Sequence, residues 1–159
     1  AGKSLTGPSH FSYRDNNISV YKSFTHQHLG EIKKTLSAMN GSEIPEINFV
    51  PMRGDFPRGI FASLYTECSI EDSEKVANLY KEYYKDSPFV HYSDNGISLK
   101  EVINTNKCLI HTELHNGKIH ITSIIDNLIK GASGQAVENM NLMFGLDQKR
   151  GLSLKPSTF

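Results

Sequence analysis

Cysteine is scarce in this chain, which contains only Cys68 and Cys108 among its 159 residues. Both thiols stand in apolar, strand-like sequence and not at the spacing of metal ligands. We therefore expect two core cysteines in a reduced, cytosolic protein, and no metal site.

Net charge is also absent, because 17 basic residues balance 17 acidic ones and the sequence pI is about 7.2. This balance argues against nucleic acid or an anionic membrane as a partner. No apolar run approaches the roughly 20 residues that a membrane-spanning helix needs. The chain opens on polar residues without the pattern of a signal peptide, so we expect a cytoplasmic protein without a membrane segment.

The glycine fingerprint of dinucleotide-binding folds, Gly-x-Gly-x-x-Gly after a strand, does not occur. The patterns predict strands at 18–25, 46–52, 60–68 and 89–92, helices at 29–39 and 69–85, and a hairpin of strands 107–114 and 118–125 around Asn116-Gly117. This order predicts an α+β fold with a mixed, largely antiparallel sheet and helices packed on one face. We expect one domain over residues 1–145 and a loose C-terminal tail over 146–159.

Two predicted helices carry apolar side chains at three- and four-residue steps. In the helix at 69–85 the inward residues are Val76, Leu79, Tyr80 and Tyr83. In the last helix the stripe is Ile129, Ala132, Ala136, Met140 and Met143. Gly131 and Gly134 interrupt the start of this helix, where each glycine costs roughly 1 kcal/mol against alanine. They indicate either close approach of a backbone or flat ligand, or a plain loop before a shorter helix.

His26, His28 and Arg58 are the candidate chemical groups. The two histidines are expected on the same side of an extended segment, where an imidazole could transfer protons. From the spacing alone, a pair of surface histidines at a strand end is the favoured alternative. No third metal ligand follows at a sensible spacing. Arg58 stands between Pro57 and Gly59, and its fork suits a carboxylate or phosphate, with a salt bridge as the alternative.

Several segments resemble one enzyme family. Residues 126–136 (Asp-Asn-Leu-Ile-Lys-Gly-Ala-Ser-Gly-Gln-Ala) and 139–145 (Asn-Met-Asn-Leu-Met-Phe-Gly) are similar to the C-terminal signature of N-acetyl-gamma-glutamyl-phosphate reductases. Ala1-Gly2-Lys3 resembles the end of a family loop, His26-Gln27-His28 with Glu31-Ile32 resembles a family motif, and Phe56–Ile60 resembles a family strand start. Gly30 stands where that motif has proline.

The resemblance implies a glyceraldehyde-3-phosphate dehydrogenase-like C-terminal domain of an NADP-dependent acyl-phosphate reductase of arginine biosynthesis. It implies His26 as general acid/base and His28 and Arg58 as substrate-binding residues. It also implies cofactor contacts from Asn127, Gly131 and Gly134, so that the turn 127–134 forms a wall near the nicotinamide. We expect the isolated chain to tolerate Gly134→Ala. The substitution should damage NADP binding or assembly only when the N-terminal half of the enzyme is present.

In the family, the nucleophilic cysteine and the dinucleotide-binding half precede the position of Ala1. The resemblance therefore implies a C-terminal half that is inactive alone, with the N-terminal half and a second copy (homo-dimer or tetramer) as partners. Two alternatives stay open: the same chemistry on an N-succinyl-glutamyl or carrier-bound aminoadipyl phosphate, or a non-catalytic binding module that kept the fold.

Overall fold

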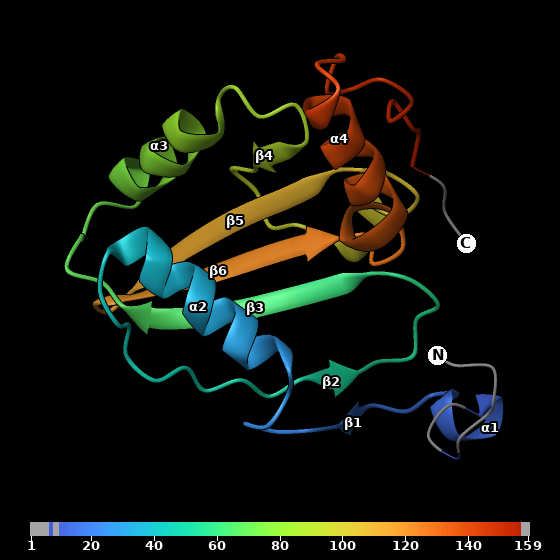
Figure 1. Cartoon of the computed structure of the whole chain (residues 1–159). Coiled ribbons are helices and arrows are strands. Elements are labelled where there is room, and N and C mark those ends of the chain that lie inside the picture. Colours follow the sequence, from blue (N-terminus) through green and yellow to red (C-terminus); the bar gives the residue numbers. More distant parts are fainter. Residues whose placement is uncertain (1–6, 8–9, 157–159) are drawn as a thin grey trace. The chain divides into compact units, whose positions relative to one another are not determined.

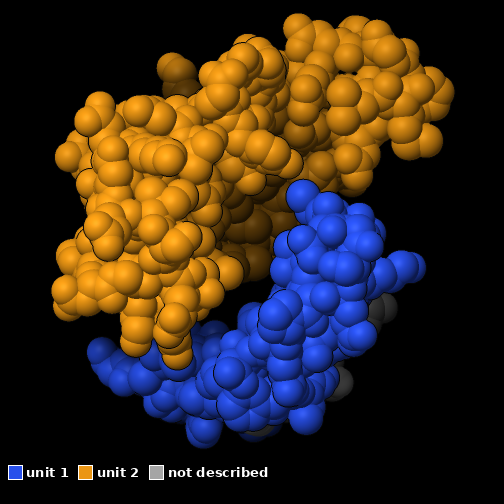
Figure 2. All heavy atoms as spheres, turned by 90° about the vertical axis from the view of Figure 1, so that its left-hand side faces the viewer, with its two compact units in different colours: residues 1–56 blue, residues 57–159 orange. Residues whose placement is uncertain are grey.

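The computed structural model describes residue 7 and residues 10–156, so the resemblance at Ala1-Gly2-Lys3 lies outside the described residues. The chain forms two compact units, Ala1–Phe56 and Pro57–Phe159, which Figure 2 shows in different colours. The predicted domain of residues 1–145 includes both units and stays a prediction.

The first unit contains α1 (Phe11–Arg14), β1 (Ser19–Val20), α2 (His28–Asn40) and β2 (Met52–Arg53). β1 and β2 form a short antiparallel pair. The strand predicted at 18–25 is wrong beyond Val20, because Lys22 (φ 46°) and Phe24 (φ 58°) adopt left-handed backbone conformations that no strand continues through. The strand predicted at 46–52 is likewise reduced to its last residue and Arg53. Helix α2 is confirmed and ends at Gly41 with φ 71°.

The second unit is built on a four-stranded sheet of order β3-β6-β5-β4 (Figure 1). Its strands are β3 (Ile60–Glu67), β4 (Val90–Tyr92), β5 (Cys108–His115) and β6 (Lys118–Ile125). β4 and β5 run parallel, whereas the β3–β6 and β5–β6 pairs are antiparallel. The predicted α+β fold with a mixed, largely antiparallel sheet is confirmed. The β5–β6 hairpin is also confirmed, since Asn116 (φ 49°) and Gly117 (φ 72°) adopt the left-handed conformations of a tight primed turn.

Helix α3 (Ser73–Tyr84) contacts β4 and β5. It begins later than predicted because the Asp72 carboxylate caps it, accepting from the backbone N–H groups of Glu74 (2.9 Å) and Lys75 (3.2 Å). Val76 is buried as predicted, but the inward placement of Leu79 and Tyr83 is wrong, since they are 54% and 70% exposed. The helix lies at the β4 edge of the sheet and buries only a narrow face.

The chain then continues through a short 3₁₀ turn, η2 (Leu99–Glu101), and, after the hairpin, through η3 (Ile129–Ser133) and α4 (Gly134–Met143). The deepest apolar side chains are Val102, Ile103 and Ile124, each 0% exposed. Polar side chains share this core: Thr105, Asn106, Asp126 and Asn141 are each at most 1% exposed. In the described part of the chain no helix is long and apolar enough to cross a membrane.

The buried face of α4 is polar and consists of Gly134, Glu138 and Asn141. The predicted apolar stripe is not buried within this chain, since Met140 and Met143 are 46% and 82% exposed. The prediction of a loose C-terminal tail is wrong for residues 146–152. The Asn141 amide donates to the carbonyls of Gln148 (3.2 Å) and Arg150 (2.9 Å), and Leu152 is 4% exposed.

Candidate functional site

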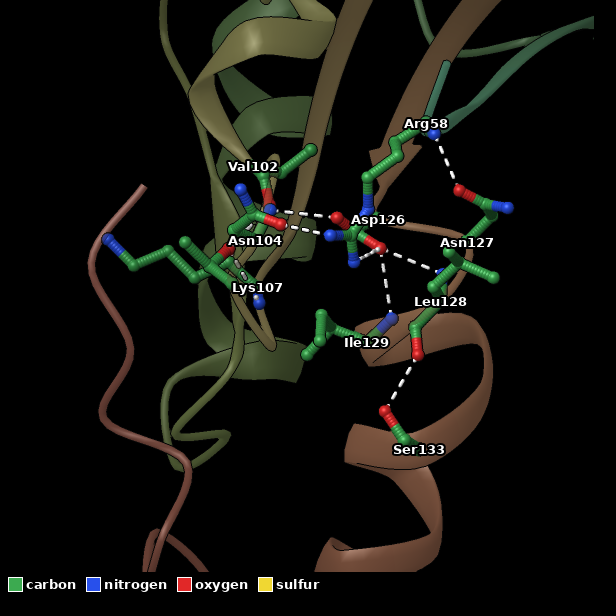
Figure 3. A network of polar contacts seen from close by, with 11 residues as sticks. Arg58, Val102, Asn104, Lys107, Asp126, Asn127, Leu128, Ile129 and Ser133 are labelled. Carbon is green, nitrogen blue, oxygen red and sulfur yellow. Dashed lines mark hydrogen bonds and ion pairs between the residues drawn. The ribbon is translucent and has the colours of Figure 1, made fainter. Parts of the chain in front are cut away.

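The carboxylate of Asp126 lies at the centre of a buried hydrogen-bond network directly after β6 (Figure 3). Its Oδ1 accepts from the backbone N–H groups of Leu128 (2.8 Å) and Ile129 (2.9 Å) and from the Arg58 guanidinium (3.1 Å). Its Oδ2 accepts from the backbone N–H of Asn104 at 2.7 Å. One side chain therefore joins the start of β3, the loop after η2 and the turn that leads to α4.

Asp126 is ionised despite complete burial of its side chain. Burial raises the pKa of this carboxyl, but hydrogen bonds from Asn104, Ile129, Leu128 and Arg58 outweigh burial and hold the pKa below its ordinary 3.8. Sequence reasoning missed this role. An Asp at the start of a helical segment is a recognised capping signal, but the contact with Arg58 lies 68 positions away in sequence.

Arg58 lies just before β3, with its side chain 25% exposed. One terminal nitrogen donates to Asp126 and the other to the side-chain oxygen of Asn104. Its Nε is buried and finds no hydrogen-bond acceptor among the described residues. The fork that the sequence assigns to a substrate anion thus already has partners within the chain. Its role in substrate binding stays a prediction, beside the structural ion pair.

Asn127 and the π-helical turn η3 follow Asp126 directly. The Asn127 side-chain oxygen accepts from the backbone N–H of Gly59 at 2.7 Å, which fixes the direction of its amide. The wide turn is held by bonds from Gly131 N–H to the Asp126 carbonyl (2.9 Å) and from Ser133 N–H to the Leu128 carbonyl (3.0 Å). Such π-helical segments are rare and often mark functional sites.

The two glycines of this turn differ in their surroundings. Gly131 is exposed, and an added Cβ would meet only ordinary contacts, the nearest 3.4 Å from the Asp126 carbonyl oxygen. Gly134 is buried, and an added Cβ would overlap the Asn106 side-chain oxygen and lie 2.8 Å from the Ile129 carbonyl oxygen. The expectation that the isolated chain tolerates Gly134→Ala is therefore wrong, because this glycine is needed by the packing of its own unit.

A second buried carboxylate, Glu138, lies on α4, which follows η3 in the chain. It accepts from Lys130 (2.6 Å), Asn106 (2.8 Å) and Gln148 (2.8 Å). Burial raises its pKa, but the bonds from Lys130, Gln148 and Asn106 lower it more, so the pKa lies below the ordinary 4.5. The Lys130 ion pair ties the π-helical turn to α4.

His26 and His28 lie in the first unit, with ring centroids 4.5 Å apart. The predicted extended segment is wrong, because His28 is the first residue of α2 and Gln27 is already helical. The His28 backbone N–H donates to His26 Nδ1 at 3.2 Å, so a neutral His26 carries its proton on Nε2. Partial burial, followed by electrostatic interactions with His28 and Lys22, lowers the pKa of His26 below 6.5.

Both cysteines are half-buried and free. Burial raises the pKa of Cys108, and this outweighs its contact with Ser123 Oγ at 3.5 Å. A thiol with a raised pKa is a poor nucleophile at neutral pH. Across residues 7 and 10–156, no group of three or more His, Cys, Asp or Glu side chains could hold a metal ion.

Two groups of predicted site residues are thus brought together. His26 and His28 form a pair in the first unit. In the second unit Arg58 and Asn127 are linked through Asp126 and Gly59, and Gly131 and Gly134 follow in the same turn. Both groups consist of the polar and flexible residue types that catalytic and ligand-binding sites use.

The chain belongs to a known class of protein. Residues 1–127 match the family model described as semialdehyde dehydrogenase, dimerisation domain, and the chain belongs to this family. Over its whole length the chain is similar to proteins named N-acetyl-gamma-glutamyl-phosphate reductase. It is 55% identical to that of Phocaeicola vulgatus, 56% to that of Bacteroides thetaiotaomicron and 53% to that of Christiangramia forsetii. The chain spans 49% of the length of each of these relatives.

Proposed function

We propose that this chain is the C-terminal half of an NADP-dependent N-acetyl-gamma-glutamyl-phosphate reductase of arginine biosynthesis, an enzyme that reduces an acyl phosphate to a semialdehyde and releases phosphate. The observation that carries the proposal is the match of 100% of the chain, at 53–56% identity, to reductases of that name. The proposal places the protein in the cytoplasm.

The turn from Asn127 to Gly134 is proposed to hold the nicotinamide, which supplies the hydride when the cofactor is bound. Two observations fit a flat ring at this position. Gly131 is exposed and carries no side chain, so a ring could lie against the backbone. The Asn127 amide is fixed by its bond from Gly59 N–H (2.7 Å), which gives its NH₂ group a defined direction for donating a hydrogen bond. Gly134, buried against Asn106, would act by shaping the turn.

His26 is proposed as the general acid/base. With Nδ1 accepting from the His28 N–H at 3.2 Å, the imidazole has one fixed tautomer and presents Nε2 to a substrate. A pKa below 6.5 keeps most of this side chain neutral at pH 7, so Nε2–H can donate a hydrogen bond to an oxygen that gains negative charge. His28 and Arg58 are proposed to bind the substrate carboxylate or phosphate.

The remaining half of the reductase is the proposed partner, and it would supply the nucleophilic cysteine and the dinucleotide-binding fold. The apolar residues of α4 and the segment after it support a partner domain, because Leu142, Met143 and Phe144 are 56%, 82% and 73% exposed. The family description, a dimerisation domain, supports a homo-dimer or tetramer of the whole enzyme.

The whole protein that carries this chain tests the proposal. We expect it to oxidise NADPH with N-acetyl-gamma-glutamyl phosphate, and to reduce NADP with N-acetylglutamate semialdehyde only when phosphate is present. The 159-residue chain alone should do neither, which makes it the matched control. Greater activity with N-succinyl-glutamyl phosphate or a carrier-bound aminoadipyl phosphate would identify that compound as the substrate in place of the N-acetyl one. Tight NADPH binding without turnover of any of these substrates would contradict the proposed reaction.

A further inference from the structure

The buried network around Asp126 connects three segments that the chain must hold together. Arg58 comes from the residues before β3, Asn104 from the loop after η2, and Leu128 and Ile129 from the start of η3. The Asp126 side chain is 0% exposed, so water cannot replace any of these donors.

Asp126 also determines where the proposed cofactor residues lie. Its carboxylate fixes the backbone of Leu128 and Ile129, and its own carbonyl accepts from Gly131 N–H at 2.9 Å. Asn127, the next residue, is bonded to Gly59 N–H, and Gly59 is adjacent to the Arg58 that Asp126 binds. Asp126 thus holds the start of the Asn127–Gly131 segment through its carboxylate and the end of that segment through its backbone carbonyl. Both carboxylate oxygens accept bonds within the protein, so this side chain does not need to touch a ligand.

We infer that Asp126 is a positioning residue that sets the geometry of the nicotinamide-binding turn through its bonds to Arg58, Asn104, Leu128 and Ile129. The inference rests on the proposed function, since it assigns a purpose to the network beneath the proposed cofactor site. It predicts that Asp126 controls affinity for NADPH without contacting it.

Asp126→Asn is the direct test in the whole enzyme, because it preserves shape but replaces one acceptor oxygen by an NH₂ group. Whichever way the amide faces, that NH₂ group meets a backbone or guanidinium N–H, so the turn must shift. We expect the Kd for NADPH, measured by fluorescence, to rise about tenfold or more, the ratio that about 1.4 kcal/mol corresponds to. The KM for the acyl phosphate should change less than the KM for NADPH.

Asn141→Ala is the matched control. Asn141 is 1% exposed and bonds to the Gln148 and Arg150 carbonyls, so its loss should lower thermal stability without changing the Kd for NADPH. A second measurement is the double variant with Gly131→Ala. If Asp126 acts through the turn, its effect on NADPH affinity and that of Gly131→Ala should be clearly less than additive, whereas Asn141→Ala should combine additively with either.

The outcomes separate this inference from the proposed function. An Asp126→Asn enzyme that loses stability as Asn141→Ala does, but binds NADPH as the wild type does, overturns the inference and leaves the reductase proposal standing. A rise only in the KM for the acyl phosphate also overturns it, because the carboxylate would then act through Arg58 on the substrate. A wild-type protein that binds no NADPH overturns both.

Discussion

Alanine at Gly134 should destabilise the chain, although alanine at Gly131 should not. An added Cβ at Gly134 would overlap the Asn106 side-chain oxygen and lie 2.8 Å from both Cγ2 and the carbonyl oxygen of Ile129. The carbonyl belongs to the π-helical turn and cannot move freely. Asn106 is held by its bond to Glu138 at 2.8 Å. The extra carbon therefore has no room without distortion.

The magnitude follows from two opposing effects. Overpacking of a close-packed site typically costs about 1–3 kcal/mol. Replacing a helical glycine by alanine returns up to about 1 kcal/mol. Because the added carbon would overlap both a side-chain oxygen and a backbone carbonyl, the cost for Gly134→Ala lies at the upper end of that range, and the net expectation is a loss of about 2 kcal/mol. For Gly131→Ala, whose nearest contact would be 3.4 Å, only the favourable helix effect remains and stability should be unchanged or slightly higher.

Urea unfolding of the 159-residue chain, followed by far-UV circular dichroism, measures both variants against the wild type. The urea midpoint should fall for Gly134→Ala at an unchanged m-value and stay constant or rise for Gly131→Ala. A Gly134→Ala chain as stable as the wild type would refute the packing argument. In the whole enzyme Gly131→Ala should weaken NADPH binding while stability is kept, and wild-type affinity there would argue against a ring on this backbone.

Three further predictions concern the charged and titratable groups. In the whole enzyme His26→Asn should lower kcat by roughly 10²–10⁴-fold, the usual contribution of a positioned acid/base. His28→Asn should mainly raise the KM for the acyl phosphate. Steady-state kinetics that show the reverse would exchange the two assignments. Arg58→Lys should raise the KM for the acyl phosphate. It should also reduce stability by about 1–3 kcal/mol in urea unfolding, because the guanidinium bonds to the Asp126 carboxylate and the Asn104 amide oxygen are lost. An unchanged KM would show that Arg58 serves only the ion pair with Asp126. The folded pKa values of Asp126 and Glu138 lie below 3.8 and 4.5, so both stabilise the chain above these values and lose that contribution as pH falls through the lower folded pKa values. Unfolding free energies measured between pH 7 and 3 should therefore fall steeply at the acid end, and Asp126→Asn should flatten that fall.

Local signals in the sequence predicted the parts of the fold that depend on local physics. Asn116-Gly117 adopts positive φ and joins two paired strands as the turn chemistry requires. Helix α2 ends at Gly41 because glycine readily adopts the left-handed cap. The prediction of a strand at 18–25 was wrong because Lys22 and Phe24 adopt positive φ values. Residues with these side chains rarely adopt such values, so the sequence gives no local signal for them.

The candidate site could be predicted only in part, because its geometry depends on contacts distant in sequence. Arg58 and Asp126 are 68 positions apart, and Asn106 and Glu138 are 32 apart. The spacing of apolar residues predicted an apolar stripe on the last helix. The face of α4 that is buried within the chain instead carries Glu138 and Asn141. A hydrophobic pattern identifies a surface that some partner can cover. It does not identify the face on which a helix meets polar partners from elsewhere in its own chain.

Two buried carboxylates explain how the π-helical turn persists. Asp126 holds its first residues through Leu128 and Ile129, and Glu138 holds it through Lys130 at 2.6 Å. A π-helical segment has poorer hydrogen-bond geometry than an α-helix and persists only where its surroundings fix it. Buried ionised carboxylates are costly unless every oxygen is bonded, and both are bonded by several donors. Bonds within the chain thus fix the backbone of the turn. A cofactor that binds there would spend little free energy on ordering the backbone, which is the advantage that preorganised sites have over flexible loops.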